Sequence, residues 1–306
     1  MDFGKLSDIS RVDFTLPPDH PDTLNLLNRY KQDLPQKPKV YIGLPVWVNK
    51  PWIGEYYPAG MKEKESLLWY GKQFNTIELN STHYHIPGPD TIDRWRHTVP
   101  QGFTFCPKFP QLISHEGPLV SSLDLTATFC EAIAGLEDKL GCSFLQLPPY
   151  FGPKQLPDLE KFVQYIPESV PLAVELRHPD WFVDNVASLE LFEVLEKFRV
   201  GTVLTDVAGR RDVLHIRLTT PMAMVRFVGN GLHPSDYTRI DDWVERIKVW
   251  LEAGLQELYF FVHEPDNITS PELATYLIEK LNKVCGLDVK PPKKFVQAVQ
   301  GELFKE

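Results

Sequence analysis

The chain has 306 residues, of which 43% are hydrophobic and 24% are charged, as is ordinary for a globular protein with one large core. Its net charge of −9 argues against a general nucleic-acid surface, because such a surface needs a basic face to attract phosphates. No run reaches the ~18 apolar residues of a membrane span, and no secretory leader is visible. The four cysteines show no CxxC spacing. We therefore expect a cytoplasmic protein.

Residues 1–38 are predicted to be an extension rather than a separate domain. Five prolines interrupt this segment, and only Thr23–Leu34 has the composition of a helix. Too few apolar residues are present for an independent core. We expect the extension to pack on the domain that follows.

Residues 39–285 alternate between short apolar runs and helix-like stretches. Eight runs are typical of strands, namely Val40–Pro45, Asn75–Asn80, Phe103–Lys108, Cys142–Leu147, Pro171–Arg177, Val200–Asp206, Met222–Val228 and Leu258–His263. Apolar residues recur at helical spacing between most of them, but Val207–Pro221 shows little of this periodicity. Eight strand–helix units predict an α/β fold, the closed (β/α)8 TIM barrel. Residues 286–306 are predicted to be a tail with a short terminal helix.

Polar residues stand at the ends of these runs, where TIM barrels hold their chemistry. Side chains alternate between the two faces of a strand, so Glu78 points into the barrel if Ile77 and Leu79 pack on helices. Buried charges need partners, water or a ligand, which predicts either a site for a small polar substrate or a layer of structural ion pairs. The strand-end residues are Glu78, Asn80, Lys108, Gln146, Glu175, Arg177, Asp206, Arg226 and His263.

Aromatic residues follow several of the predicted strands. Trp47 comes after the first strand and Tyr84 after the second. Their faces could stack on a sugar ring or a base, although about half of the aromatic set is expected to fill loop cores. For Trp181 and Phe182 the packing role is favoured.

The first functional hypothesis is an enzyme, a hydrolase or lyase, acting by acid–base chemistry on a small polar, anionic or glycosidic substrate. Glu78 and Glu175 come from opposite sides of the mouth, and paired carboxylates serve as general acid and base when their environments separate their pKa values. The expected catalytic residues are Glu78, Glu175, Lys108, His115 and His263. The expected substrate-binding residues are Asn80, Tyr84, Gln146, Arg177, Asp206, Arg226 and Trp47.

Two alternatives belong to other classes. Metal-assisted phosphodiester hydrolysis would draw on Glu78, Glu175, Asp206, His263 and Glu264 as ligands, but the chain has no HExxH spacing and several cations lie nearby, so no metal is expected. A non-catalytic binder of nucleic acid or of a small molecule is the third hypothesis, and the acidic balance disfavours nucleic acid. No glycine-rich phosphate loop is present, so no nucleotide cofactor is expected. The oligomeric state stays open.

The segment Gly229–Tyr237, between the seventh strand and its helix, has two interpretations. Gly229 and Gly231 would suit the hinges of a mobile lid over the mouth. Pro234 stiffens the segment, which favours an ordered surface loop instead.

Several phrases of the sequence are specific enough to suggest a family. They are Phe74–Tyr84, Phe103–Lys108 followed by Ser114 and His115, Phe144–Pro149, and Val174–Phe182. Over about residues 39–285 the chain resembles the family called domain of unknown function 72, or YecE-like. The resemblance implies a TIM barrel with a polar pocket at its mouth and no established reaction. The chain departs from the family pattern in two places. The family's first strand usually ends in Ser-Gly-Trp, whereas this chain has Pro45-Val46-Trp47. The family's last strand commonly ends in Asn-Asn, whereas this chain has His263-Glu264.

Overall fold

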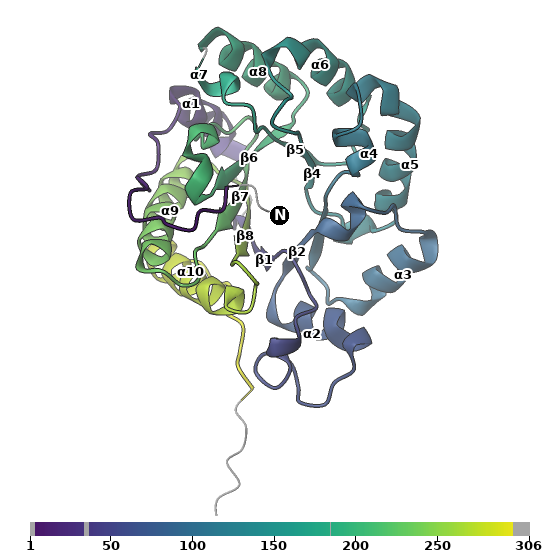
Figure 1. Cartoon of the computed structure of the whole chain (residues 1–306), viewed down its shortest axis with the longest axis vertical. Helices are drawn as coiled ribbons and strands as arrows, with labels where there is room; N and C mark the ends of the chain where they lie inside the picture. Colours follow the sequence, from purple (N-terminus) through teal and green to yellow (C-terminus); the bar gives the residue numbers. More distant parts are fainter. Residues whose placement is uncertain (1–3, 34–36, 184, 296–306) are drawn as a thin grey trace, which may run out of the picture.

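Eight parallel strands form a nearly closed ring in this computed structural model, which describes residues 4–33, 37–183 and 185–295 (Figure 1). The strands are β1 (Lys39–Leu44), β2 (Thr76–Leu79), β3 (Thr104–Pro107), β4 (Ser143–Gln146), β5 (Leu172–Glu175), β6 (Gly201–Asp206), β7 (Met222–Val228) and β8 (Glu257–His263). Their order is β3-β2-β1-β8-β7-β6-β5-β4, and single bridges from Phe105 to Leu140 and from Lys108 to Phe144 join β3 to β4. The predicted (β/α)8 TIM barrel is confirmed.

Helices surround the strands on the outside of the ring (Figure 1). They are α1 (Pro21–Tyr30), α2 (Ser66–Gln73), α3 (Pro89–Thr98), α4 (Gln111–Ser114), α5 (Leu123–Ala134), α6 (Leu156–Tyr165), α7 (Asp180–Val183), α8 (Asn185–Lys197), α9 (Pro234–Ala253) and α10 (Ser270–Cys285). In α9, for example, Ile240, Trp243 and Ile247 recur at helical spacing and are buried. No helix in the described part of the chain is long and apolar enough to cross a membrane.

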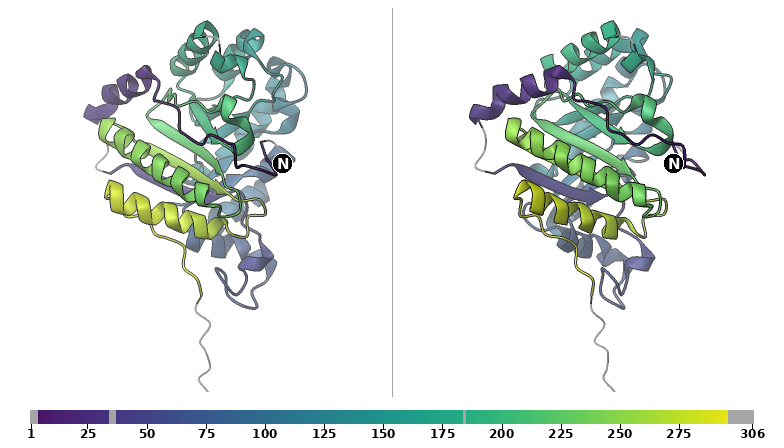
Figure 2. Two further views of the ribbon diagram at one scale, coloured as in Figure 1. Left: turned by 60° about the vertical axis from the view of Figure 1, so that its left-hand side comes forward. Right: turned by 90° about the vertical axis from the view of Figure 1, so that its left-hand side faces the viewer.

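The amino-terminal segment covers the side of the barrel where a helix is missing. Between β6 and β7 the chain forms a short 3-10 helix, η8 (Ala208–Val213), and α1 lies beside α8 and α9 in this place (Figure 2). Arg29 of α1 pairs with Glu196 of α8 at 3.0 Å, and Trp250 Nε1 of α9 donates to Asp19 at 2.8 Å. The extension thus occupies the position of a sixth barrel helix, and such cover is needed because both faces of a parallel sheet are buried.

The carboxyl-terminal segment has neither helix nor strand over residues 286–295. It runs past α2, where the Lys293 N–H donates to Gln73 Oε1 at 2.8 Å and the Phe295 ring packs edge-on against Trp69. The short helix predicted for the tail would fall in residues 296–306, which lie outside the described residues.

Two apolar cores lie on either side of the strands. The larger core lies between strands and helices and includes Ile77 and Leu79, whereas the smaller core fills the barrel interior and includes Cys106, Phe144 and Met224. Ile77 and Leu79 therefore lie on the helix side of β2, as the predicted alternation of strand faces requires. Glu175 of β5 and Arg226 of β7 lie two residues beyond Ala173 and Met224 of the smaller core, on the same strand faces, and so enter the interior at the carboxyl-terminal mouth.

Candidate functional site

Arg226 of β7 joins two carboxylates inside the mouth of the barrel. Its Nε and Nη2 donate to the two oxygens of Glu78, each at 2.9 Å, and its Nη1 donates to Glu175 Oε2 at 2.5 Å. Glu78 and Glu175 are at most 1% exposed. The planar guanidinium thereby holds β2, β5 and β7 in one hydrogen-bonded unit, with the bidentate geometry that makes such pairs strong.

Gln146 at the end of β4 extends this network to Lys108. Arg177 Nε donates to Glu175 Oε1 at 2.6 Å, and Arg177 Nη2 donates to Gln146 Oε1 at 2.7 Å. The same amide oxygen accepts a hydrogen bond from Lys108 Nζ at 3.0 Å. The neutral amide therefore separates the ammonium from the guanidinium and binds both.

Glu78 carries two further contacts on the other side of the mouth. Asn80 Nδ2 donates to Glu78 Oε1 at 2.8 Å, and His263 Nε2 of β8 lies 2.9 Å from Glu78 Oε2. The His263 side chain is 16% exposed, so the imidazole forms part of the rim. Asn80 Oδ1 is buried with no partner among the described residues.

The two carboxylates are held in their ionised form. Burial alone raises the pKa of a carboxyl group, but Arg226 and His263 together outweigh burial at Glu78. At Glu175 burial is outweighed by the combined charges of Arg177, Arg226 and Lys108. The pKa of Glu78 lies well below its usual range and that of Glu175 falls to about 2. Burial, followed by the charge of Arg226, lowers the pKa of Lys108 to about 8.

Two histidines lie on the rim beside Lys108. Burial, and next the charge of Lys108, lower the pKa of His115 and bring that of His83 to about 4, so both rings are neutral at pH 7. His115 Nδ1 lies 2.6 Å from Ser114 Oγ, and His83 Nδ1 lies 2.8 Å from the Phe109 carbonyl oxygen. His83 was not among the predicted site residues, although it follows the end of β2 closely and could have been found by extending the search a few residues beyond each strand.

The predicted aromatic residues divide by exposure. Tyr84 is 71% exposed near His83, with the two ring centroids 5.2 Å apart. Trp47 packs edge-on against Trp95 of α3, with the two ring centroids 5.6 Å apart. Trp181 is fully buried, as its packing role predicts.

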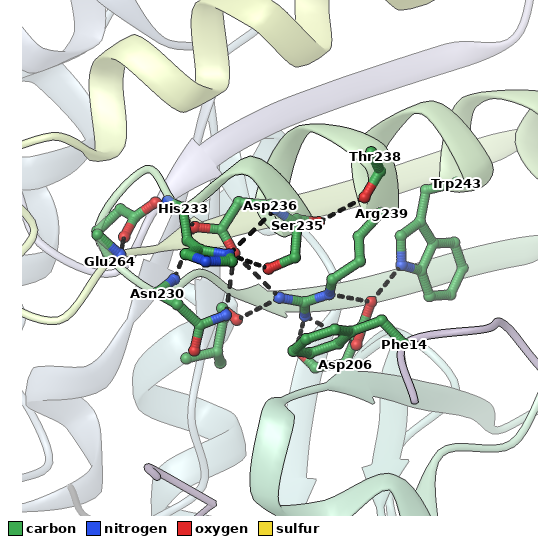
Figure 3. A network of polar contacts seen from close by, with 12 residues as sticks. Phe14, Asp206, Asn230, His233, Ser235, Asp236, Thr238, Arg239, Trp243 and Glu264 are labelled. Carbon is green, nitrogen blue, oxygen red and sulfur yellow. Dashed lines mark hydrogen bonds and ion pairs between the residues drawn. The ribbon is translucent and has the colours of Figure 1, made fainter. Parts of the chain in front are cut away.

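Asp206 does not point into the mouth, and its prediction as a substrate-binding residue is wrong. Its carboxylate accepts hydrogen bonds from Arg239 Nε at 3.4 Å and from Trp243 Nε1 at 2.8 Å, both on α9 (Figure 3). It also forms ion pairs with Arg239, at 2.8 Å, and with Arg211. Leu204 belongs to the outer core, and Asp206 lies two residues further on the same face. The alternation used on the other strands would have placed it outside.

The loop between β7 and α9 is tied down by hydrogen bonds. Asp236 accepts from the N–H groups of Asn230 and His233 at 2.8 and 2.9 Å, and the Gly231 N–H donates to Glu264 Oε2 at 2.7 Å (Figure 3). These contacts favour the ordered surface loop over the lid. Glu264 is 3% exposed and its Oε1 lacks a partner among the described residues, and burial raises its pKa to about 7.

The metal ligands considered for the alternative reaction are not brought together. Within the described residues no three His, Cys, Asp or Glu side chains are grouped so as to hold a metal ion. Asp206 points to the outer face of the strands, where it pairs with Arg239, and both oxygens of Glu78 accept hydrogen bonds from Arg226. The sequence does contain one HxH pair, His83 and His85, but His83 is turned to the Phe109 carbonyl and His85 is exposed.

Comparisons with known proteins agree on one family. The sequence profile described as "Protein of unknown function DUF72" matches residues 41–295. The chain is 32% identical over 262 residues to the UPF0759 protein YecE of Escherichia coli, covering 80% of this chain and 93% of that protein. It is 26% identical over 150 residues to the UPF0759 protein YunF of Bacillus subtilis, covering 47% of this chain and 52% of that protein. A crystal structure of a DUF72 family protein from Enterococcus faecalis has a TM-score of 0.65 at 19% identity, covering 83% of this chain and 100% of that one. The chain therefore belongs to the DUF72 family, as its sequence phrases indicate.

Proposed function

We propose that the mouth of the barrel binds a small anionic molecule and transforms it by acid–base chemistry. The observation that carries this proposal is Lys108, which is 1% exposed and has no carboxylate within ion-pair distance in the described part of the chain. Arg226 and Arg177, by contrast, are paired with Glu78 and Glu175. A buried charge without a counterion is costly, and an anionic group of a ligand would offset that cost.

The proton carriers in this proposal are histidines rather than glutamates. A general acid needs a pKa near the working pH, whereas the pKa values of both Glu78 and Glu175 are lowered. Glu78 instead orients the His263 ring from 2.9 Å, which makes Glu78 a positioning residue and His263 the proton carrier on that side. His115, neutral and close to Ser114, is the carrier on the other side.

Two other versions of the function have less support. Glycoside hydrolysis uses a carboxyl group with a raised pKa, and the pair at this mouth has no such member. Metal-assisted hydrolysis loses Asp206 as a ligand because that side chain faces α9. A binder without turnover would share the anion site and would differ in the absence of a product.

The proposal is tested by calorimetric titration with three matched ligand classes, which are small carboxylates, sugar phosphates and the corresponding neutral sugars. Anionic ligands should bind and neutral sugars should not. Lys108→Met should weaken anion binding by about tenfold or more, since a hydrogen bond to a charged group contributes roughly 1.5–3 kcal/mol. Lys197→Met is the matched control, because Lys197 is paired with Glu160 on the exposed outer surface. Equal binding of neutral and anionic ligands would refute the proposal.

A further inference from the structure

A cavity of about 380 Å³ lies on the outer side of the barrel, between α10, the first turn of α9 and the carboxyl-terminal segment. Its volume falls within the range of pockets for small ligands, roughly 300–1,000 Å³. The lining residues are Tyr56, Tyr237, Glu272, Thr275, Tyr276, Glu279, Pro292 and Lys294. Three phenol rings and two carboxylates in so small a space favour a cation, because the face of an aromatic ring carries negative charge.

One half of this cavity already holds a cation of the chain itself. Lys294 Nζ lies over the Tyr56 ring, 5.6 Å from its centroid, and pairs with a Glu55 oxygen at 2.8 Å. A tyrosine face and a neighbouring carboxylate thus bind one ammonium group between them.

The other half has two further rings and no cation against them from the cavity side. The rings of Tyr237 and Tyr276 are perpendicular, at 89°, with their centroids 4.9 Å apart, and so form a corner. Lys280 lies over Tyr276 at 4.9 Å, but it is not a lining residue and therefore contacts that ring from outside the cavity. Within the described residues no cation lies over the ring of Tyr237.

Two carboxylates without partners stand beside this corner. Glu272 and Glu279 lie about two helical turns apart on the side of α10 that lines the cavity. Neither has an ion-pair partner in the described part of the chain, since Lys280 and Lys294 pair with other carboxylates. Burial, and next the charge of Glu272, raise the pKa of Tyr237, so this carboxylate acts directly on the phenol. The corner therefore repeats the chemistry of the Lys294 site but lacks its ammonium group.

We propose that the corner formed by Tyr237 and Tyr276 binds a small quaternary ammonium ion, with Glu272 and Glu279 as its counterions. A primary ammonium ion is compact and strongly hydrated. Methyl groups on the nitrogen weaken that hydration and add apolar contact with the rings, as in the recognition of choline by aromatic cages. The site is separate from the mouth of the barrel, so this inference goes beyond the anion-binding function.

Titration of the full chain with choline, followed by NMR of the choline methyl protons, tests the proposal. The matched neutral probe is dimethylbutanol, in which a carbon atom replaces the ammonium nitrogen and the shape is kept. Choline should bind at one site, and the alcohol should bind about 5- to 30-fold more weakly, which is the size of two exposed cation–π contacts. Added salt should weaken choline binding, because both carboxylates are exposed.

Variants of the lining residues locate the bound ion. Tyr237→Leu should weaken choline binding by about 2- to 5-fold, whereas Tyr237→Phe keeps the ring and should retain the affinity. Glu272→Gln combined with Glu279→Gln should weaken binding and remove most of its salt dependence. Glu245→Gln is the matched control, because Glu245 is an exposed carboxylate of α9 that does not line the cavity. If Tyr237→Leu does not fold, the double glutamine variant, whose two changes are exposed, decides the question.

Three results would overturn the inference. The first is equal affinity for choline and dimethylbutanol, since the positive charge would then contribute nothing. The second is choline binding that survives both Tyr237→Leu and the double glutamine variant, and the third is the absence of choline binding. The anion site is tested separately, because Lys108→Met should leave the affinity for choline unchanged.

Discussion

Replacing Arg226 by methionine should destabilise the fold strongly, because it removes the main partner of a buried carboxylate. The structure sets the size of the effect. Glu175 keeps Arg177 at 2.6 Å, whereas Glu78 keeps only Asn80 and the imidazole of His263. The loss should thus equal that of one uncompensated buried carboxylate, about 3–5 kcal/mol. Total stabilities are roughly 5–15 kcal/mol, so urea denaturation followed by circular dichroism would detect it easily.

The pH dependence of this loss has a definite sign. In the wild-type protein the pKa of Glu78 is lowered on folding, so its contribution is present above the unfolded pKa, roughly 4.3, and is lost as the pH falls through the folded value. In Arg226→Met burial should raise the same pKa instead. The variant should therefore be most impaired at neutral pH, and its deficit should shrink towards pH 5.

A double variant provides the decisive control for this prediction. Glu78→Gln combined with Arg226→Met leaves no charge at this position and should recover most of the lost stability. Arg29→Met, which breaks the pair between the exposed Arg29 and Glu196 outside the barrel, should cost no more than about 1 kcal/mol. The reasoning is refuted if Arg226→Met costs less than about 1 kcal/mol, or if its cost is the same in the Glu78→Gln background.

Three further predictions follow from other parts of the fold. Burial, and next the charge of Arg217, lower the pKa of His215 to about 3, so the free energy of unfolding should decline as the pH falls from about 6.5 towards 3. The loss by pH 5 is about 2 kcal/mol, and a comparison of urea midpoints at pH 5 and pH 8 should show that His215→Phe removes this pH dependence. Asp206→Asn should lower the thermal midpoint but leave the anion affinity measured by calorimetry unchanged, because the Asp206 side chain faces α9. A weaker affinity would show that Asp206 contributes to anion binding. Gly43→Ala should lower the free energy of unfolding, measured by urea denaturation, by about 1–3 kcal/mol, because the added Cβ would lie 2.3 Å from the Thr76 carbonyl oxygen. An unchanged urea midpoint would contradict the close approach of β1 and β2.

The sequence alone was enough to predict the barrel and the face on which most site residues lie. Strand alternation is a local property with a period of two, so Ile77 and Leu79 on one face place Glu78 on the other without knowledge of any distant residue. The same rule fixed the inward direction of Lys108, Glu175 and Arg226. It would also have turned Asp206 outward, had Leu204 been used as the reference.

Only the tertiary structure decided which charges are partners. Arg226 and Glu78 are 148 positions apart in the sequence, and their bidentate contact depends on the closure of the ring. The role of Gln146 as the shared acceptor of Lys108 and Arg177 likewise depends on β3, β4 and β5 being neighbours. The place of α1 in the gap between α8 and α9 depends on contacts such as Arg29 with Glu196. Pairing of this kind depends on distances between remote segments, which local periodicity does not contain.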